Sequence, residues 1–226
     1  MNNSPSRPPI ASEAAHWERL YLGSTSNLPW EVERTPAEFA QWAELIAPGA
    51  RVLDVGCGRG QHSIAMAERG FNVTGIDFSQ TAVEAARRRA AQRRLVNASF
   101  EVADIIRFRS QRVFDFVYDY SVFHHIPRAD HLAYRDTVAR AVRACGLLAL
   151  VCYAETDPIV SLNNQQTRIG KLGNVIYHPT RRELAQLFKK YFSVKSYQLT
   201  TLGPQAGHHA HHIVFSRTAD RLSQPR

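Results

Sequence analysis

Glycines and carboxylates with the spacing of a nucleotide-binding loop stand in the first third of the chain. The segment VLDVGCGRG runs from Val52 to Gly60, and a second apolar run, GFNVTGID, ends at Asp77. The apolar start of the first segment predicts a buried parallel strand, and its glycines allow backbone amides to approach a ligand closely. A carboxylate that ends the next strand can meet ribose hydroxyls. The pattern therefore predicts a site for a cofactor that carries a nucleoside.

Two common phosphate-binding motifs do not fit this glycine spacing. Dinucleotide enzymes use G-x-G-x-x-G, whereas Gly56, Gly58 and Gly60 alternate here and Gln61 follows them. A Walker-type loop requires Lys followed by Ser or Thr, and no such pair comes after Gly60. With Asp54 in front, the alternation resembles motif I of the class I, Rossmann-like S-adenosylmethionine-dependent methyltransferases.

The resemblance implies that the glycine loop contacts the methionine part of S-adenosyl-L-methionine, the expected cofactor. It also implies that Asp77 binds the ribose hydroxyls, that Phe78 lies against the adenine, and that Asp104 accepts from the adenine amine. The cofactor-binding residues expected on this basis are Trp30, Asp54, Gly56, Cys57, Gly58, Gly60, Asp77, Phe78, Asp104, Ile105, Asp119 and Tyr120.

Strands and helices alternate along the chain as a doubly wound α/β domain requires. Strands are predicted at 52–55, 71–76, 99–103, 114–118, 147–153, 193–200 and 212–216, and helices at 61–69, from Ser79, at 132–142 and from Thr180. Thr180 and Glu183 predict a capping box at the last of these helices. The order of these elements predicts a seven-stranded, mostly parallel sheet with helices on both faces, and the resemblance implies a Rossmann-like fold with an antiparallel last strand.

The predicted domain organisation is simple. We expect an N-terminal tail and helix over 1–28, the methyltransferase domain over 29–217, and a C-terminal tail over 218–226. Residues 154–179 are long and irregular for a connection, which predicts a substrate loop. Ala144 to Gly146 is expected to form a turn, at the end of the sheet opposite the crevice, where the superfamily commonly has Pro-Gly-Gly.

Two segments narrow the resemblance to small-molecule methyltransferases, including the thiopurine, thiol and halide group. The segment FDFVYDYSVFHHI resembles theirs, and Pro29, Trp30, Pro36, Phe39 and Trp42 match an N-terminal arrangement in which the tryptophan closes over the cofactor. The alternative for Trp30 is an aromatic staple of the N-terminal helix. No Asn-Pro-Pro-Tyr motif follows the fourth strand, which argues against adenine or glutamine amides as acceptors.

His124 and His125 follow the fourth strand and are the candidate catalytic residues. Histidine can take a proton near neutral pH, so one of them could be the base. Alternatively, the pair caps a short helix or bonds to backbone. A halide acceptor needs no base and a thiol needs little help, whereas a phenol would benefit more. Tyr120, Phe123 and Tyr153 are expected near the transferred methyl group, where aromatic rings favour a cationic sulfur.

A second group of histidines lies in the run GHHAHHIVF, from Gly207 to Phe215. Along a strand, His209 and His211 would share one face and His208 and His212 the other, so the four cannot converge on one ion. No metal site is therefore predicted. Because the start of an antiparallel last strand lies near the crevice, His208 and His209 are expected to border the acceptor pocket. The predicted substrate-binding residues are Phe123, Tyr153, His208 and His209.

Composition bears on partners and location. The net charge of +8 raises the possibility of nucleic acid, but the arginines of 87–94 have no interleaved aromatic residues, which favours a solvated helix face. A small-molecule acceptor is therefore expected and nucleic acid is not. RNA or protein methylation, or a catalytically silent S-adenosylmethionine-binding protein, remain the alternatives. The longest apolar run is too short to cross a membrane, and we expect a cytoplasmic protein.

Overall fold

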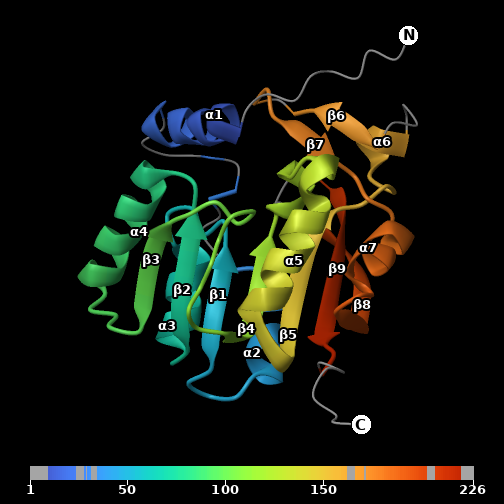
Figure 1. Cartoon of the computed structure of the whole chain (residues 1–226). Helices are drawn as coiled ribbons and strands as arrows, with labels where there is room; N and C mark the ends of the chain where they lie inside the picture. Colours follow the sequence, from blue (N-terminus) through green and yellow to red (C-terminus); the bar gives the residue numbers. More distant parts are fainter. Residues whose placement is uncertain are drawn as a thin grey trace.

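One large β-sheet organises the described part of the chain. The computed structural model describes residues 10–23, 28, 30–31, 35–161, 166–170, 172–202 and 207–219. Its seven-stranded sheet has the order β3-β2-β1-β4-β5-β9-β8 (Figure 1). The strands are β1 (Arg51–Val55), β2 (Asn72–Asp77), β3 (Ala98–Val102), β4 (Phe114–Tyr120), β5 (Val142–Tyr153), β8 (Phe192–Leu202) and β9 (His208–Arg217). Strands β1 to β5 pair in parallel and β9 runs antiparallel to its neighbours, which confirms the predicted fold class.

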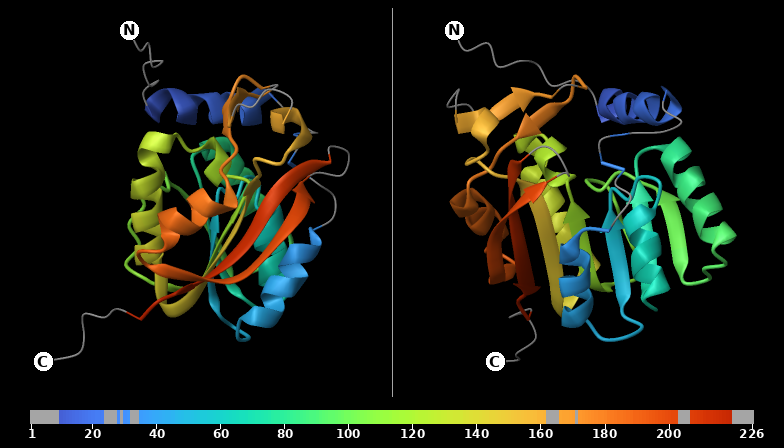
Figure 2. Two further views of the ribbon diagram at one scale, coloured as in Figure 1. Left: turned by 90° about the vertical axis from the view of Figure 1, so that its right-hand side faces the viewer. Right: turned by 180° about the vertical axis from the view of Figure 1, so that it is seen from behind.

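Helices cover both faces of this sheet (Figure 2). The helices of the described residues are α1 (Ile10–Gly23), α2 (Ala37–Leu45), α3 (Gln61–Glu68), α4 (Gln80–Gln92), α5 (His131–Ala141), α6 (Pro158–Ser161) and α7 (Arg181–Phe188), with short 3-10 helices η1 (Phe123–His125) and η2 (Arg128–Asp130). Successive strand residues point to opposite faces. Val52 accordingly packs in the core formed by α2 and α3, and Leu53 in the core formed by α5 and α7. Both faces are buried, which explains the continuous apolar runs of the central strands.

Local sequence signals place most element boundaries correctly. The backbone amide of Ala82 donates to Oγ of Ser79 at 3.0 Å, so Ser79 caps α4 as predicted. Thr180 and Glu183 form the predicted capping box of α7. The predicted turn at 144–146 is wrong, because these residues form a bulge within β5. Phe114 pairs with Val142 while Phe116 pairs with Leu147, so the longer stretch of β5 loops outward between the two pairs.

Residues 154–179 were expected to be irregular, but part of this segment forms regular structure. They contain α6 and a two-stranded antiparallel sheet of β6 (Thr167–Ile169) and β7 (Val175–Tyr177). Strands of three residues are too short to give a readable period, and β7 packs against η1, a contact that only the folded chain creates. Figure 1 shows β6, β7 and α1 beyond the edge of the sheet where β1, β2, β4 and β5 end. This edge, with the start of β9, is the crevice of the fold.

Candidate functional site

The loop between β1 and α3 is shaped so that glycine is required. Gly56, Gly58 and Gly60 have φ values of +70°, +53° and +78°. A Cβ on Gly56 would stand 2.2 Å from Cγ2 of Val122, and one on Gly58 would stand 2.7 Å from the hydroxyl oxygen of Tyr21. The backbone there is therefore both left-handed and closely approached, as a cradle for a ligand needs. Cys57, between the first two glycines, is buried.

Asp77 joins the glycine loop to the second strand. Its Oδ2 accepts from the amide of Gly58 at 2.8 Å, and its Oδ1 accepts from the amide of Ser79 at 2.9 Å. Burial raises the pKa of Asp77, although these amide donors oppose the rise. Each carboxylate oxygen retains a lone pair, so two hydroxyl donors of a ribose can be added to the existing bonds.

Asp104 presents an unsatisfied oxygen at the end of the third strand. Its Oδ1 accepts from the amide of Ile106 at 2.8 Å, whereas Oδ2 is buried and has no hydrogen-bond partner. A buried acceptor without a donor is destabilising, and an adenine amine is a donor of the kind that it lacks. Ile105 beside it is buried and Phe78 is half-buried, so both can offer apolar contact to a base. The residues present thus fit the expected cofactor.

Asp54 and Asp119, also predicted to bind cofactor, are engaged inside the protein. Asp54 accepts from the hydroxyl of Ser63 at 2.6 Å, and burial raises its pKa to about 7. Asp119 accepts from the amide of Val122 at 2.8 Å and from the hydroxyl of Tyr134 at 2.6 Å, and burial raises its pKa to about 6. These carboxylates anchor the first turn of α3 and the start of η1. Tyr120 is half-buried at the crevice end of β4.

Helix α1 lies over the cofactor edge of the crevice and was not expected there. Glu18 accepts from the hydroxyls of Ser79 and Thr81, each at 2.5 Å, which fastens α1 to the start of α4. Trp30 donates from Nε1 to the hydroxyl of Tyr21 at 3.1 Å. Both roles foreseen for Trp30 are compatible with this position, since it packs on α1 and borders the glycine loop through Tyr21. Pro29 lies outside the described residues.

His124 and His125 stand at the crevice in η1. The amide of Tyr153 donates to Nδ1 of His124 at 3.3 Å, which leaves the ring proton on Nε2, and burial holds the pKa of His124 well below 6.5. Nδ1 of His125 lies 3.3 Å from the carbonyl of Val175 and 3.0 Å from Nδ2 of Asn174. Burial lowers the pKa of His125 to about 4. The geometry matches the backbone-bonding alternative better than the general base.

Tyr153 is the centre of an aromatic wall at the ends of β4 and β5. Its ring is stacked on His124, with ring centres 4.3 Å apart, and on His178, at 5.4 Å and 12° between planes. The ring of His208 is 5.1 Å away, and the guanidinium carbon of Arg168 lies 5.6 Å from the centre of the tyrosine ring. The wall therefore combines flat rings with positive charge at the crevice.

Two other predicted pocket residues lie elsewhere. Phe123 is fully buried, its ring packs on Tyr134 at 5.1 Å, and it lines a cavity with Tyr177 and Leu184 on the side of α5 and α7. His209 lies on the opposite face of β9 from His208, and its Nδ1 is 3.3 Å from the hydroxyl of Thr156. The alternation of β9 decides the position of His209.

The remaining histidines of the run are structural. Nε1 of Trp42 donates to Nε2 of His212 at 2.8 Å, and Nε2 of His211 lies 2.9 Å from the carbonyl of Pro179. They point to opposite faces of β9, as the alternation predicted. Within the described ranges, no three histidine, cysteine or acidic side chains gather in a way that could hold a metal ion.

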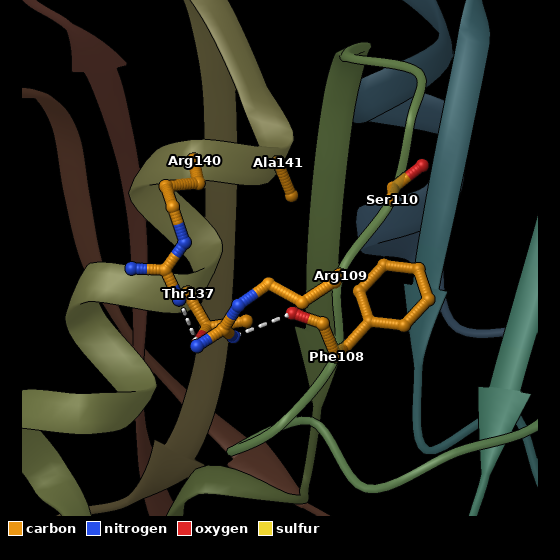
Figure 3. Close-up of a pocket in the computed structure, with 6 residues that line it drawn as sticks. All are labelled: Phe108, Arg109, Ser110, Thr137, Arg140 and Ala141. Carbon is orange, nitrogen blue, oxygen red and sulfur yellow. Dashed lines mark hydrogen bonds between the residues drawn. The ribbon is translucent and has the colours of Figure 1, made fainter.

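A small pocket lies away from the crevice. Figure 3 shows its lining, which is Phe108, Arg109, Ser110, Thr137, Arg140 and Ala141. These residues come from the connection before β4 and from the last turn of α5, the turn that leads into the far end of β5. The pocket therefore contributes nothing to the site.

Comparison with protein families identifies the family that the central part of the chain matches. The family described as "Methyltransferase domain" matches residues 52–146, which include the glycine loop, Asp77 and Asp104. Residues 52–146 thus form a methyltransferase domain of the class I, S-adenosylmethionine-dependent type. The match ends in the bulge of β5, so α1, the β6–β7 pair and β9 lie outside it.

Curated relatives include methyltransferases of small molecules. The chain is 33% identical over 114 residues to 2-heptyl-1-hydroxyquinolin-4(1H)-one methyltransferase of Mycobacteroides abscessus, a match that covers 50% of each chain. It is 28% identical over 151 residues to thiocyanate methyltransferase 1 of Brassica oleracea, covering 66% of each. The aligned part thus spans about half the length of the first relative. Thiocyanate and thiol methyltransferases are thus among the distant relatives of the chain, as the resemblance predicted.

Solved structures share the fold over nearly the whole chain. The 1,6-didemethyltoxoflavin-N1-methyltransferase of Burkholderia thailandensis, solved with its substrate and S-adenosylhomocysteine, superposes with a TM-score of 0.73 at 20% identity. The match covers 96% of this chain and 93% of that one. At this identity the likeness concerns the fold alone. None of the helices among the described residues is long and apolar enough to span a membrane.

Sequence reasoning missed several residues of the site. Glu18 and Tyr21 reach it from α1, and Asp157, Arg168 and His178 reach it from the segment between β5 and α7. No spacing connects these positions to motif I, because tertiary packing alone brings them to the crevice. The one usable signal was the length of 154–179, a segment whose Asp157, Arg168 and His178 lie at the crevice.

Proposed function

We propose that this protein transfers a methyl group from S-adenosyl-L-methionine to a small aromatic, heteroaromatic or thiol acceptor. The observation that carries the proposal is the Tyr153 wall, which lies at the crevice next to the strand ends that form the cofactor site. When bound, the cofactor supplies a methyl group on a positively charged sulfur. The protein must then hold the acceptor atom about 3 Å from that methyl group and exclude water.

The cofactor would be held by three parts of the chain. The glycine loop offers close backbone approach, Asp77 has free lone pairs for the ribose, and Oδ2 of Asp104 lacks a donor that the adenine amine would provide. Tyr120, at the crevice end of β4, is the aromatic ring placed to favour the cationic sulfur. Trp30 and Tyr21 would cover the cofactor on the side of α1.

The acceptor side favours a flat and electron-rich molecule. Tyr153, His124 and His178 are flat rings at the crevice, and Arg168 adds a positive charge beside them. A planar ring that carries an ionisable hydroxyl or thiol is complementary to both features. Two curated relatives are named for acceptors of this size, a hydroxyquinolinone and thiocyanate.

The basic composition provides little support for an RNA acceptor. Arg87 of α4 donates to the carbonyl of Phe100 at 2.7 Å, and Arg89 donates to the carbonyl of Arg59 at 3.3 Å. These guanidinium groups tie α4 to its surroundings. An RNA acceptor is therefore one of the alternatives that the experiment distinguishes.

The experiment measures S-adenosylhomocysteine release with hydroxyquinolines, phenols, thiols, iodide and total RNA as separate acceptors. Asp104→Asn tests the cofactor site, because its amide would face the adenine amine donor to donor. We expect about tenfold weaker S-adenosylmethionine binding by calorimetry, equivalent to about 1.4 kcal/mol. Asp136→Asn is the matched control, since Asp136 pairs with Arg135 on α5.

Two results would contradict the proposal. Turnover with RNA alone would replace the small-molecule acceptor, and cofactor binding without turnover of any acceptor would indicate a silent binding protein. Unchanged cofactor affinity in Asp104→Asn would instead refute the assigned adenine contact.

A further inference from the structure

A buried carboxylate lies behind His208 at the start of β9. Nδ1 of His208 is 2.8 Å from Oδ2 of Asp157. The Asp157 side chain is fully buried, whereas that of His208 is 18% exposed. An imidazole that donates its Nδ1 proton to a carboxylate carries a lone pair on Nε2. Resting on the function proposed above, we propose that His208, oriented by Asp157, accepts the proton of a hydroxyl group on the acceptor.

Two other imidazoles of the crevice, those of His124 and His178, are less suited to this role. Nδ1 of His124 accepts from the amide of Tyr153, so its Nε2 carries a proton. His178 uses both nitrogens, because Nδ1 donates to the carbonyl of Ala154 at 3.1 Å and Nε2 accepts from Nε of Arg168 at 3.1 Å. Neither ring can take a proton without breaking an existing bond.

The position of His208 follows from the antiparallel last strand. Ala210 of β9 pairs with Tyr153 of β5, so His208 lies just beyond the end of β5 and on the same face of β9 as Ala210. Its ring lies 5.1 Å from that of Tyr153, within the aromatic wall. Among the residues that the structure describes, none hydrogen-bonds to Nε2 of His208. The free nitrogen is thus placed at the crevice and at the wall where a planar acceptor would stack.

The proposed step moves one proton to the histidine and one methyl group to the acceptor oxygen. The O–H bond of the acceptor breaks, and its proton binds to Nε2 of His208. The electron pair left on the oxygen forms the new bond to the methyl carbon, while the pair of the broken carbon–sulfur bond stays on sulfur. His208 ends as a cation beside the Asp157 carboxylate and returns its proton to water. General bases of this kind contribute about 10²–10⁴-fold to rate.

This arrangement selects among the acceptor classes. A neutral aromatic hydroxyl needs a proton acceptor at neutral pH, whereas a halide needs none and a thiol needs little. The titratable and charged groups around His208 are Asp157, Tyr153, His124, His178 and Arg168. Asp157 is the only acid in this group, so the surroundings also stabilise an oxygen that becomes negative. The dyad therefore points to methylation at oxygen of an aromatic or heteroaromatic hydroxyl.

The test compares two acceptors with the same ring system that differ in the ionisation of their hydroxyl group, together with a thiol. Initial rates are measured at neutral pH with a hydroxyquinoline that is neutral, a nitro-substituted hydroxyquinoline that is ionised, and a thiol. His208→Gln is expected to lower kcat about 10²-fold or more on the neutral hydroxyquinoline and to change the rate on the ionised one only a few-fold. The loss should shrink as the pH rises past the pKa of the neutral acceptor.

Asp157→Asn should show the same selectivity with a smaller loss, and Asp136→Asn is the control for removing a carboxylate elsewhere. A second measurement needs no cofactor, because the absorbance of the hydroxyquinoline reports its ionisation when it binds. Wild-type protein should shift the apparent pKa of the bound hydroxyl downward, and His208→Gln should abolish the shift. This measurement separates proton acceptance from general damage to the fold.

The outcomes distinguish the two proposals. Equal losses on the neutral and ionised hydroxyquinolines, or no loss on either, would overturn the role of His208 and leave the methyltransferase function in place. Turnover by wild type of thiols alone would overturn the oxygen assignment. Absence of turnover with every small acceptor would overturn both.

Discussion

Asp54 makes the stability of this protein depend on pH in a way that one substitution can isolate. Its carboxyl is buried at the end of β1 and bonded to Ser63 at 2.6 Å. Burial raises its pKa from 3.8 to about 7, against the opposing effect of the Ser63 hydroxyl. Because the folded state binds this proton more tightly than the unfolded state, Asp54 contributes stability that is full below pH 3.8 and is lost as the pH rises through about 7.

The expected magnitude follows from the pKa difference. One pKa unit corresponds to about 1.36 kcal/mol, so between pH 5 and pH 8 the contribution of Asp54 falls by about 2.5 kcal/mol. His62 and His125 have pKa values lowered to about 4 by burial, and they change stability in the opposite sense between pH 4 and 6.5. Asp54→Asn retains an oxygen for Ser63 and removes only the titration. The contribution of the histidines to the pH dependence therefore cancels in the difference between wild type and variant.

The assay is urea unfolding of both proteins, without cofactor, at several values of pH from 5 to 8. The free energy of unfolding of wild type minus that of Asp54→Asn should fall by about 2.5 kcal/mol across this range. Ser63→Ala in the wild-type background removes the donor to Asp54 and should move the fall to higher pH. A difference that stays constant with pH would refute the reasoning, as would one that rises.

Three further predictions concern the glycine loop, α1 and the core. In urea unfolding, Gly56→Ala should lower the free energy of unfolding by about 1–2 kcal/mol because of its left-handed backbone, and further because its Cβ would overlap Val122. Adding Val122→Ala to the same chain should relieve the overlap and leave the loss that comes from the backbone. Glu18→Gln should loosen α1 and so speed limited proteolysis within it several-fold, with little change in Tm; an unchanged cleavage pattern would contradict its anchoring role. Trp42→Phe leaves Nε2 of His212 buried without its donor, so we expect a loss of about 1–3 kcal/mol, and a double-mutant cycle with His212 that shows no coupling would exclude this bond as the cause.

The cofactor half of the site could be predicted from the sequence because its determinants are local. Alternating glycines in positive φ, a carboxylate at the end of the next strand and continuous apolar strands are each written within a few residues. The same holds for the Ser79 cap and the Thr180 capping box. Parallel strands then bring their carboxyl ends to one edge, so Asp77 and Asp104 fall at the crevice without further information.

The acceptor half was decided by tertiary structure. Residue types alone made His124 and His125 the candidate bases, but the amide of Tyr153 fixes the proton of His124 on Nε2. Strand direction and alternation set His208 apart from His209, and a carboxylate from a segment without readable periodicity, Asp157, makes His208 distinct. Whether an imidazole can accept a proton depends on the partner of its other nitrogen, and in this chain that partner lies 51 residues away in the sequence.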